Sequence, residues 1–376
     1  MNLPHTAAAQ QRLAQIEQAR HAVMREGRAV TEVALDGWAD RAWIERSWRR
    51  CLANGQRPDQ RVAFDVLPAQ ARRRAQEASH GLVSAARPVL DKLGRAIANT
   101  RYFAILTDAR GVVVDVNGPI DRSDRRAQLI TRIGVDLSER SVGTTAIGAV
   151  LAELQPVWLH RGEHFFHDTS MYSCAGAPLF GPDGQCVGML DLTGIDTAER
   201  PELKHLVAQS ARSIENALAL SQPHSLLLRL NWPGRTLGDD ADGLLCLDAD
   251  GRVTAANQTA RQMVSQLNRP GGSVHCSELF AMPWEALFDG ARHDAVVEVP
   301  LWSGLRLNAL PQAPGQALSP VPRATPPTPR PLPLKDLETE LIRKAVQDAR
   351  GNVMQAARAL GISRATVYRK LGTLRG

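Results

Sequence analysis

Residues 174–192, CAGAPLFGPDGQCVGMLDL, place two apolar segments on either side of Gly181-Pro-Asp-Gly184. A turn made of Gly, Pro and Asp between two apolar runs is typical of a β-hairpin. The same pattern occurs earlier in the chain, where Tyr102–Thr107 and Val112–Val116 flank Asp108-Ala-Arg-Gly111. Two hairpins of this kind predict a sheet that is mostly antiparallel.

Helical segments enclose these hairpins. Apolar residues at helical spacing predict helices at Ser141–Leu154 and Pro201–Ala219, with a strand at Pro156–His160. Three further helices are predicted near the N-terminus, at Ala7–Met24, Gly37–Leu52 and Pro68–Ala98. Strands enclosed by helices indicate an α+β domain over residues 101–220, preceded by a helical region over residues 1–100.

A second segment repeats the hairpin pattern after the long helix. Gly243–Val253 contains two apolar runs around Asp248-Ala-Asp-Gly251, and Val296–Pro300 and Leu305–Leu310 predict a closing pair of strands. We therefore expect a smaller α+β module over residues 240–310, which makes the chain a multidomain α+β protein.

Proline and charge set the C-terminal part apart from the rest. Residues 311–333 contain nine of the 23 prolines, which predicts an extended linker, and residues 334–376 have a helical pattern. Residues 350–376 hold six basic side chains and no acidic one, and this net +6 equals the charge of the whole chain. A neutral body with a basic end predicts a polyanion as the partner of that end.

The last two helices have the spacing of a helix-turn-helix. Asn352 and Ser363 are good N-caps for helices at Val353–Leu360 and Arg364–Leu374, and Gly361 supplies the turn between them. Such a motif reads bases with the start of its second helix, so the side chains there are the candidates for contact with double-stranded DNA.

The roles expected within this second helix differ by position. Arg364 and Thr366 are predicted base contacts, and Arg369 and Lys370 are predicted phosphate contacts. Tyr368 fits either a phosphate contact or core packing. The predicted DNA-binding set is Asn352, Ser363, Arg364, Thr366, Tyr368, Arg369 and Lys370.

The C-terminal stretch GNVMQAARALGISRATVYRKLG, residues 351–372, resembles the DNA-binding module of the Fis protein and of bacterial enhancer-binding regulators. Those proteins share several short segments at these spacings: G-N, A-A, L-G-I, R-x-T and a basic pair before Leu. The resemblance implies a Fis-type fold and a homodimer formed through the preceding helix. The stripe that would be buried in that dimer is Leu337, Leu341, Ile342, Ala345 and Val346.

The N-terminal half resembles the input region of acetoin-catabolism-type regulators. The matching segments are Ser47-Trp-Arg-Arg-Cys51, Leu106-Thr-Asp-Ala109 with Gly111, Gly143-Thr-Thr-Ala-Ile-Gly148, Glu163-His-Phe165 and Cys174-Ala-Gly-Ala-Pro178. The resemblance implies a GAF domain with a small-molecule pocket, although Thr145 stands where the family usually has Asn. The ligand-binding residues expected from it are Thr144, Thr145, Ile147, Glu163, His164, Phe165, Tyr172 and Cys174. The module at 240–310, with Ala255-Ala-Asn-Gln-Thr-Ala260, resembles a PAS domain.

One part of these regulators has no counterpart in the sequence. Enhancer-binding regulators normally carry an ATPase domain between the sensor and the Fis-type end. The present sequence has no G-x-x-x-x-G-K-[ST] phosphate loop, no Gly-Lys dipeptide and no G-A-F-T-G-A loop. We therefore predict a ligand-responsive, DNA-binding transcriptional regulator that is not an enzyme, has no ATPase activity and does not act through the RpoN-type sigma factor. Its expected partners are a small-molecule effector, DNA, a second copy of the chain and RNA polymerase, without cofactor or metal.

Composition indicates the compartment. The sequence has no run of about 18 apolar residues that would span a membrane and no secretory signal pattern at its N-terminus. Five scattered cysteines, none in C-x-x-C spacing, fit a reducing cytoplasm better than a disulfide framework. A cytoplasmic protein that makes no membrane contact is expected.

Three alternatives stay open at this point. His160, His164, His167 and Cys174 are of types that bind metals, which would make the protein a metal sensor. Cys174 and Cys186 lie on consecutive strands and would form a redox or enzymatic thiol pair if they faced each other. The third alternative is an architectural DNA-binding protein whose sensor domains are degenerate.

Overall fold

The computed structural model describes residues 7–30, 41–269, 274–315 and 352–372, together with residues 342, 345, 346 and 349. For residues 7–9 and 369–372 only the backbone is described. The chain divides into two compact units, Met1–Ala317 and Leu318–Gly376. Most of the predicted linker, and most of the helix predicted before the helix-turn-helix, lie outside the described residues.

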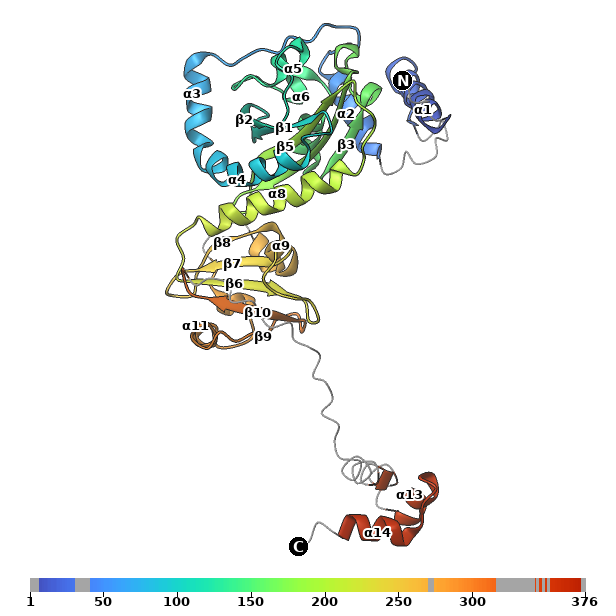
Figure 1. The fold of residues 1–376 in the computed structure, drawn as a ribbon, viewed down its shortest axis with the longest axis vertical. Helices are drawn as coiled ribbons and strands as arrows, with labels where there is room; N and C mark the ends of the chain where they lie inside the picture. The colour runs from blue at the N-terminus through green and yellow to red at the C-terminus, as the bar shows by residue number, and fades with distance from the viewer. Residues whose placement is uncertain are drawn as a thin grey trace. The chain divides into compact units, whose positions relative to one another are not determined.

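The first unit contains a five-stranded antiparallel sheet in the order β2-β1-β5-β4-β3 (Figure 1). Its strands are β1 (Tyr102–Asp108), β2 (Val113–Asn117), β3 (Val157–His160), β4 (Tyr172–Phe180) and β5 (Cys186–Ile195). Both predicted hairpins are confirmed, because β1 pairs with β2 and β4 pairs with β5. The strand β5 lies at the centre, between β1 and β4.

Helices cover both faces of this sheet. On one face, α4 (His80–Ala96) and α8 (Leu203–Leu220) pack on Leu190, Leu192 and the side chains around them. On the opposite face α7 (Ala146–Glu153) packs on β3, β4 and β5, and the core on this side also includes side chains of α1 (Ala7–Met24), α2 (Ala42–Ala53), α5 (Arg125–Ile130) and α6 (Glu139–Val142). Because side chains alternate along a strand, Met189, Asp191 and Thr193 of β5 point to this second face.

Several predicted helices have different bounds in the structure. The range predicted for α1 is confirmed, whereas α2 begins at Ala42, and the predicted start at Gly37 lies outside the described residues. The single helix predicted over Pro68–Ala98 is two helices, α3 (Ala69–Ala78) and α4, which meet at Ser79.

The helix predicted over Ser141–Leu154 is also wrong, because it is broken between α6 and α7. Gly143 adopts φ of +67°, and a Cβ at this position would lie 2.8 Å from the ring of Phe166. The glycine therefore ends α6, and Thr145 caps α7 by accepting a hydrogen bond from Gly148 N at 3.3 Å. Two short 3₁₀ helices, Arg161–Glu163 and His167–Thr169, follow β3.

A second antiparallel sheet of five strands has the order β8-β7-β6-β10-β9. Its strands are β6 (Leu226–Asn231), β7 (Gly243–Leu247), β8 (Val253–Ala256), β9 (Val297–Pro300) and β10 (Arg306–Gln312). The helical elements around them are α9 (Gln258–Met263), the 3₁₀ helix Ser265–Asn268, α10 (Cys276–Leu279) and α11 (Glu285–Arg292). Leu226, Leu228 and Leu230 of the central strand β6 contribute to the apolar core.

This sheet corrects both predicted boundaries of the second module. The module begins before residue 240, because β6 is its central strand, and it ends after residue 310, because Pro311 and Gln312 pair with β6. The strand β10 pairs with β9 only as far as Ala309, so at Pro311 it has a free side on which a missing N–H is tolerated.

The two sheets share the helix α8, which contacts strands of both (Figure 1). Asn257 fixes this junction. Its Nδ2 donates to Asn216 Oδ1 of α8 at 2.7 Å and to the Asp242 carbonyl at 2.9 Å, and its Oδ1 accepts from Leu244 N at 2.9 Å and Ala260 N at 2.8 Å. The Asn of the Ala255–Ala260 segment is thus a structural residue here.

The second unit contains the predicted pair of helices, α13 (Val353–Ala359) and α14 (Arg364–Gly372). Gly361 adopts φ of +66° in the turn, and Ile342, Ala357 and Val367 form a small core. Among the described parts of the chain, no helix combines the length and the apolar character needed to span a membrane.

Candidate functional site

A small cavity lies between the first sheet and α7. Its volume is about 30 Å³, room for one or two water molecules. The apolar part of its wall consists of Phe64, Ile105, Ile130, Leu137, Val142, Ala146 and Ile147. The polar part consists of Thr145, His164, Thr169, Tyr172, Cys174, Asp191 and Thr193.

Asp191 is the acidic group of this wall, and its side chain is completely buried on β5. Thr193 Oγ1 donates a hydrogen bond to its Oδ2, whereas no group in the described part of the chain donates to its Oδ1. Burial raises the pKa of Asp191 to about 7. A buried carboxylate oxygen without a donor is costly, so this atom is the one that a bound donor would stabilise most.

The imidazole of His164 faces the cavity as a neutral acceptor. Its Nδ1 lies 2.9 Å from the carbonyl oxygen of Arg161, which can only accept, so the proton is on Nδ1 and Nε2 is an acceptor. Burial lowers the pKa of His164 to about 4. Cys174 Sγ lies 3.5 Å from this Nε2 and 3.2 Å from Thr193 Oγ1, and burial raises the pKa of the thiol well above its ordinary value.

The structure brings together five of the eight predicted ligand-binding residues. Those that line the cavity are Thr145, Ile147, His164, Tyr172 and Cys174. Thr144, Glu163 and Phe165 are not among the residues that line it. Thr144 faces α2, the Glu163 carboxylate accepts hydrogen bonds from Arg12 at 2.5 Å and Arg41 at 2.6 Å, and Phe165 packs edge-on against Phe166.

Sequence reasoning missed Asp191 and Thr193, the acceptor in the wall and the residue that orients it. The signal was present in the sequence, since Asp191 interrupts the apolar run GMLDL of residues 188–192. A charged residue in the middle of a strand that is otherwise apolar is a candidate for function, because burial of an unpaired charge is costly.

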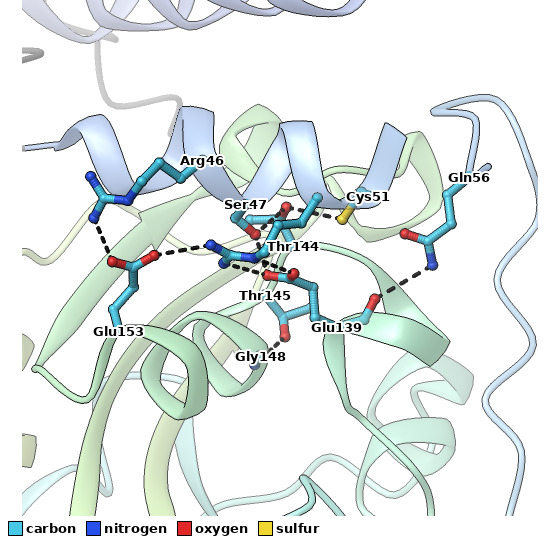
Figure 2. Close-up of polar contacts among 10 residues, drawn as sticks. Arg46, Ser47, Cys51, Gln56, Glu139, Thr144, Thr145, Gly148 and Glu153 are labelled. Atoms are coloured by element: carbon cyan, nitrogen blue, oxygen red, sulfur yellow. Dashed lines mark hydrogen bonds and ion pairs between the residues drawn. The ribbon is translucent and has the colours of Figure 1, made fainter. Parts of the chain in front are cut away.

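Two segments that carry the family resemblance, Ser47–Cys51 and Gly143–Gly148, contact each other (Figure 2). Ser47 Oγ lies 2.7 Å from Thr144 Oγ1. Arg50 of α2 donates from Nε to Glu139 Oε1 at 2.7 Å and from Nη1 to Glu153 Oε1 at 3.1 Å. The helix α2 is thereby fixed to both ends of the α6–α7 segment, which supplies one wall of the cavity.

The helix α1 holds another part of the wall, the loop that carries His164. The buried guanidinium of Arg20 donates to the carbonyl oxygens of Gly162 at 2.8 Å, His164 at 2.5 Å and Phe165 at 3.0 Å. The same group lies 5.8 Å from the ring centroid of Trp48. Both N-terminal helices therefore contact segments that line the cavity.

The residues of the metal alternative do not converge. His160 Nδ1 lies 2.8 Å from Ser173 Oγ, His164 faces the cavity and His167 is exposed. Within the described ranges, no group of three or more His, Cys, Asp or Glu side chains is arranged to hold a metal ion.

The thiol pair of the enzymatic alternative is wrong in its geometry. In the β4–β5 ladder Cys174 lies opposite Thr193, and Cys186 lies opposite Phe180 near the turn. The two thiols are therefore at different ends of the hairpin.

The helix-turn-helix has the predicted N-caps. Asn352 Oδ1 accepts a hydrogen bond from Gln355 N at 3.2 Å, and Ser363 Oγ accepts one from Thr366 N at 3.2 Å. Both side chains therefore hold helix ends.

The side chains of the second helix differ in exposure. Arg364 is exposed at its start, Thr366 is half-buried, and Tyr368 is 63% exposed, which excludes the core-packing alternative for this ring within the described unit. The side chains of the predicted phosphate contacts Arg369 and Lys370 lie outside the described residues.

Comparison with known families finds one match in the N-terminal part of the chain and one at its C-terminal end. Residues 333–374 match the bacterial regulatory proteins of the Fis family. Residues 22–216, about half of the chain, match the family described as MimR, N-terminal domain. This chain belongs to the MimR N-terminal domain family. The MimR N-terminal domain contains the cavity, α2, α7 and most of α8.

Two curated relatives of this MimR N-terminal domain protein are named as regulators. The acetoin catabolism regulatory protein of Cupriavidus necator is 32% identical over 272 residues, which cover 70% of this chain and 40% of that protein. The propane 2-monooxygenase operon transcriptional activator MimR of Mycolicibacterium goodii is 26% identical over 280 residues, which cover 68% of this chain and 46% of that protein. The chain thus spans less than half of either relative, and the resemblance to acetoin-catabolism regulators is confirmed.

Among solved structures, the crystal structure of the DhaR(N)–DhaL complex of E. coli matches part of this chain. It has a TM-score of 0.44 and 15% sequence identity, and the match covers 72% of this chain and 99% of that one.

Proposed function

We propose that this protein is a ligand-responsive transcriptional regulator, in which a small molecule bound in the cavity changes how the C-terminal helix-turn-helix binds double-stranded DNA. The observation that carries this proposal is the presence, in one chain, of a small cavity in the MimR N-terminal domain and a Fis-family segment with two capped helices. The protein acts in the cytoplasm as a homodimer, and RNA polymerase is its further partner.

The size of the cavity supports a sensing role. A molecule of several heavy atoms does not fit in about 30 Å³, so it binds only when the wall moves. The segments that would move are α7 and the loop of His164, which α2 and α1 contact. By linkage, the effector shifts DNA binding only as far as its affinity differs between the two arrangements.

The domain assignments are part of this proposal. Residues 101–220 form a GAF domain, and the second sheet, from β6 to β10, belongs to a PAS-like module. The segment between this module and the Fis-type end contains no phosphate loop, so regulation needs neither ATP hydrolysis by this chain nor the RpoN-type sigma factor.

The alternatives differ in what they require of Cys174. A thiol enzyme or redox sensor needs an accessible thiolate, whereas burial raises the pKa of this thiol and thereby disfavours the thiolate. We expect the Cys174→Ser variant to keep its DNA binding under reducing and oxidising conditions alike, and DNA binding that depends on Cys174 and on the redox conditions would favour the redox alternative.

The experiment that tests the proposal measures DNA affinity with and without small molecules. Sites for the full chain are selected from random-sequence DNA, and affinity is followed by fluorescence anisotropy against a panel of small alcohols, ketones and aldehydes. At least one compound should change the Kd for DNA by roughly fivefold or more. A Kd that no compound changes would contradict the sensor and favour the architectural alternative.

A further inference from the structure

We propose that Asp191 is the anchoring acceptor of the cavity, and that the effector is a small neutral molecule with a hydroxyl donor on an otherwise apolar body. The inference rests on the proposed function, because it names the class of molecule that the sensor binds. The evidence for it is the set of hydrogen-bond donors and acceptors in the cavity wall.

The first step concerns the two oxygens of Asp191. Oδ2 accepts from Thr193 Oγ1, which fixes the orientation of the carboxyl group. Oδ1 has no donor in the described part of the chain, and the residue is completely buried in the same wall. A hydroxyl hydrogen from a bound molecule would supply the missing hydrogen bond.

The second step concerns the other polar groups. Several donors in the wall are already committed to protein acceptors: Tyr172 Oη donates to the Arg126 carbonyl at 3.3 Å and Thr169 Oγ1 to the Phe166 carbonyl at 3.0 Å. The Nδ1 proton of His164 faces the Arg161 carbonyl, which leaves Nε2 as an acceptor. This Nε2 also lies 3.5 Å from the Cys174 thiol, so Asp191 Oδ1 is the acceptor of the wall to which no described residue donates, and it favours a molecule that brings a donor.

The third step excludes other classes of ligand. No Lys or Arg is among the described residues of the wall, so a carboxylate or phosphate would face Asp191 without a counter-charge. At pH 8, the pH of the titrations below, Asp191 is mostly ionised, so a ketone, aldehyde or ether would bring only acceptors and leave its Oδ1 without a donor. The aliphatic residues around these polar groups, such as Ile105, Ile130 and Leu137, favour an apolar body of a few carbons.

The test uses isosteric molecules that differ at one position: butan-2-ol, butan-2-one and butan-2-amine. Their binding to the full chain is measured by titration calorimetry at pH 8. We expect butan-2-ol to bind at least about tenfold more tightly than butan-2-one, because a polar group left unpaired in a buried site costs that much or more. Equal or tighter binding of the ketone would overturn the inference, and tighter binding of the amine, which is a cation at this pH, would make the ligand a cation and not a neutral hydroxyl compound.

Two variants assign the preference to Asp191. Asp191→Val removes both oxygens and should bring the ratio of the alcohol and ketone affinities close to one. Asp191→Asn keeps one acceptor and adds a donor, so its ratio of alcohol to ketone affinity should lie between the ratios of the wild type and of Asp191→Val. If Asp191→Val kept a tenfold preference for the alcohol, the anchoring role would be wrong.

A matched control and a second measurement separate binding from folding. Asp115→Asn removes a carboxylate of the same sheet that pairs with Arg87, outside the cavity, and should leave the ratio unchanged. The melting temperature of ligand-free Asp191→Val should equal or exceed that of the wild type, whereas a merely structural role for Asp191 predicts a lower one.

The outcomes distinguish this inference from the proposed function. If butan-2-ol binds with the expected preference but leaves the Kd for DNA unchanged, the regulatory function fails and the anchoring role stands. If DNA binding responds to a ketone, an aldehyde or a carboxylate and not to alcohols, the regulator stands and the inference fails.

Discussion

The two sheets of the first unit have the same number of strands and the same antiparallel pairing. The polar side chains of their central strands differ in hydrogen bonding. In the second sheet, β6 packs leucines into an apolar core, and its polar residues Arg229 and Asn231 are hydrogen-bonded to Gln312 and Asp242 at 3.1 Å each. In the first sheet, β5 directs Asp191 into the core with one oxygen unpaired. Within the described residues four buried polar atoms have no hydrogen-bond partner, Gln56 Oε1, Asp191 Oδ1, Thr197 Oγ1 and Arg261 Nε, and of these four residues Asp191 is the one that lines the cavity.

The largest expected effect on stability comes from placing a buried carboxylate, such as Asp191 provides in the first sheet, in the core of the second sheet. Leu228→Asp would bury a carboxylate in an apolar core, and should destabilise the module by more than about 5 kcal/mol. Chemical denaturation measures this loss. Val296→Asp, at a residue that is 46% exposed, is the control and should change stability by less than about 0.5 kcal/mol. A mild effect of Leu228→Asp would show that the two cores do not differ in this way.

A smaller effect is expected where a satisfied polar group is removed. Asn257→Ala deletes an N-cap and leaves Leu244 N and the Asn216 side chain without their partner, which should cost about 2–4 kcal/mol in unfolding free energy. Asn268→Ala, on an exposed side chain, is the matched control and should cost under about 1 kcal/mol. Similar losses for both variants would remove the structural role assigned to Asn257.

The dependence of stability on pH should single out Asp191. The pKa of its carboxyl group is about 7 in the folded chain and near 3.8 when unfolded, so the folded state binds the proton more tightly between these values. The stability of the wild type relative to Asp191→Asn should therefore fall as pH rises from about 4 to about 7, by up to about 4 kcal/mol, and stay constant above that. Denaturation of both proteins across this range measures it, and a difference that is independent of pH would refute the prediction.

The smallest expected effect on folding is at the exposed helix-turn-helix. Arg364→Ala should leave stability unchanged, cost about 1–3 kcal/mol at cognate DNA sites and relax base preference. Arg369→Ala or Lys370→Ala should weaken binding to all sequences and reduce its salt dependence. Titrations of cognate and random DNA at several salt concentrations compare them. If Arg364→Ala lowered the affinities for cognate and for random DNA by the same factor, Arg364 would be a phosphate contact and not a base contact.

Periodicity predicted those elements whose partners are near in sequence. Both hairpins and the bounds of α1 follow from local apolar patterns and turn residues. The strand β6 pairs with β7, which is near in sequence, and with β10, about eighty residues later, and it was missed although Pro233-Gly234 marks a turn after its apolar run. The break at Gly143 was missed because the helical pattern continues through it, and the ring of Phe166 that requires glycine there comes from another loop.

The site was predicted in part for the same reason. The family resemblance located the segments that surround the cavity, but the direction of each side chain depends on how the strands and loops pack. Thr144 and Thr145 are adjacent, yet one faces α2 and the other caps α7 at the cavity wall. Asp191 belongs to none of the segments that carry the resemblance, and its unpaired oxygen is visible only in three dimensions.

The most direct test of the central claim is the unfolding free energy of ligand-free Asp191→Val compared with the wild type at pH 8. At this pH the buried carboxylate is mostly ionised and lacks a donor on Oδ1, so its removal should leave stability equal or higher. A loss of about 2 kcal/mol or more, of the kind expected for Asn257→Ala, would show that Asp191 supports the fold and would contradict its assignment as the anchor of a ligand site.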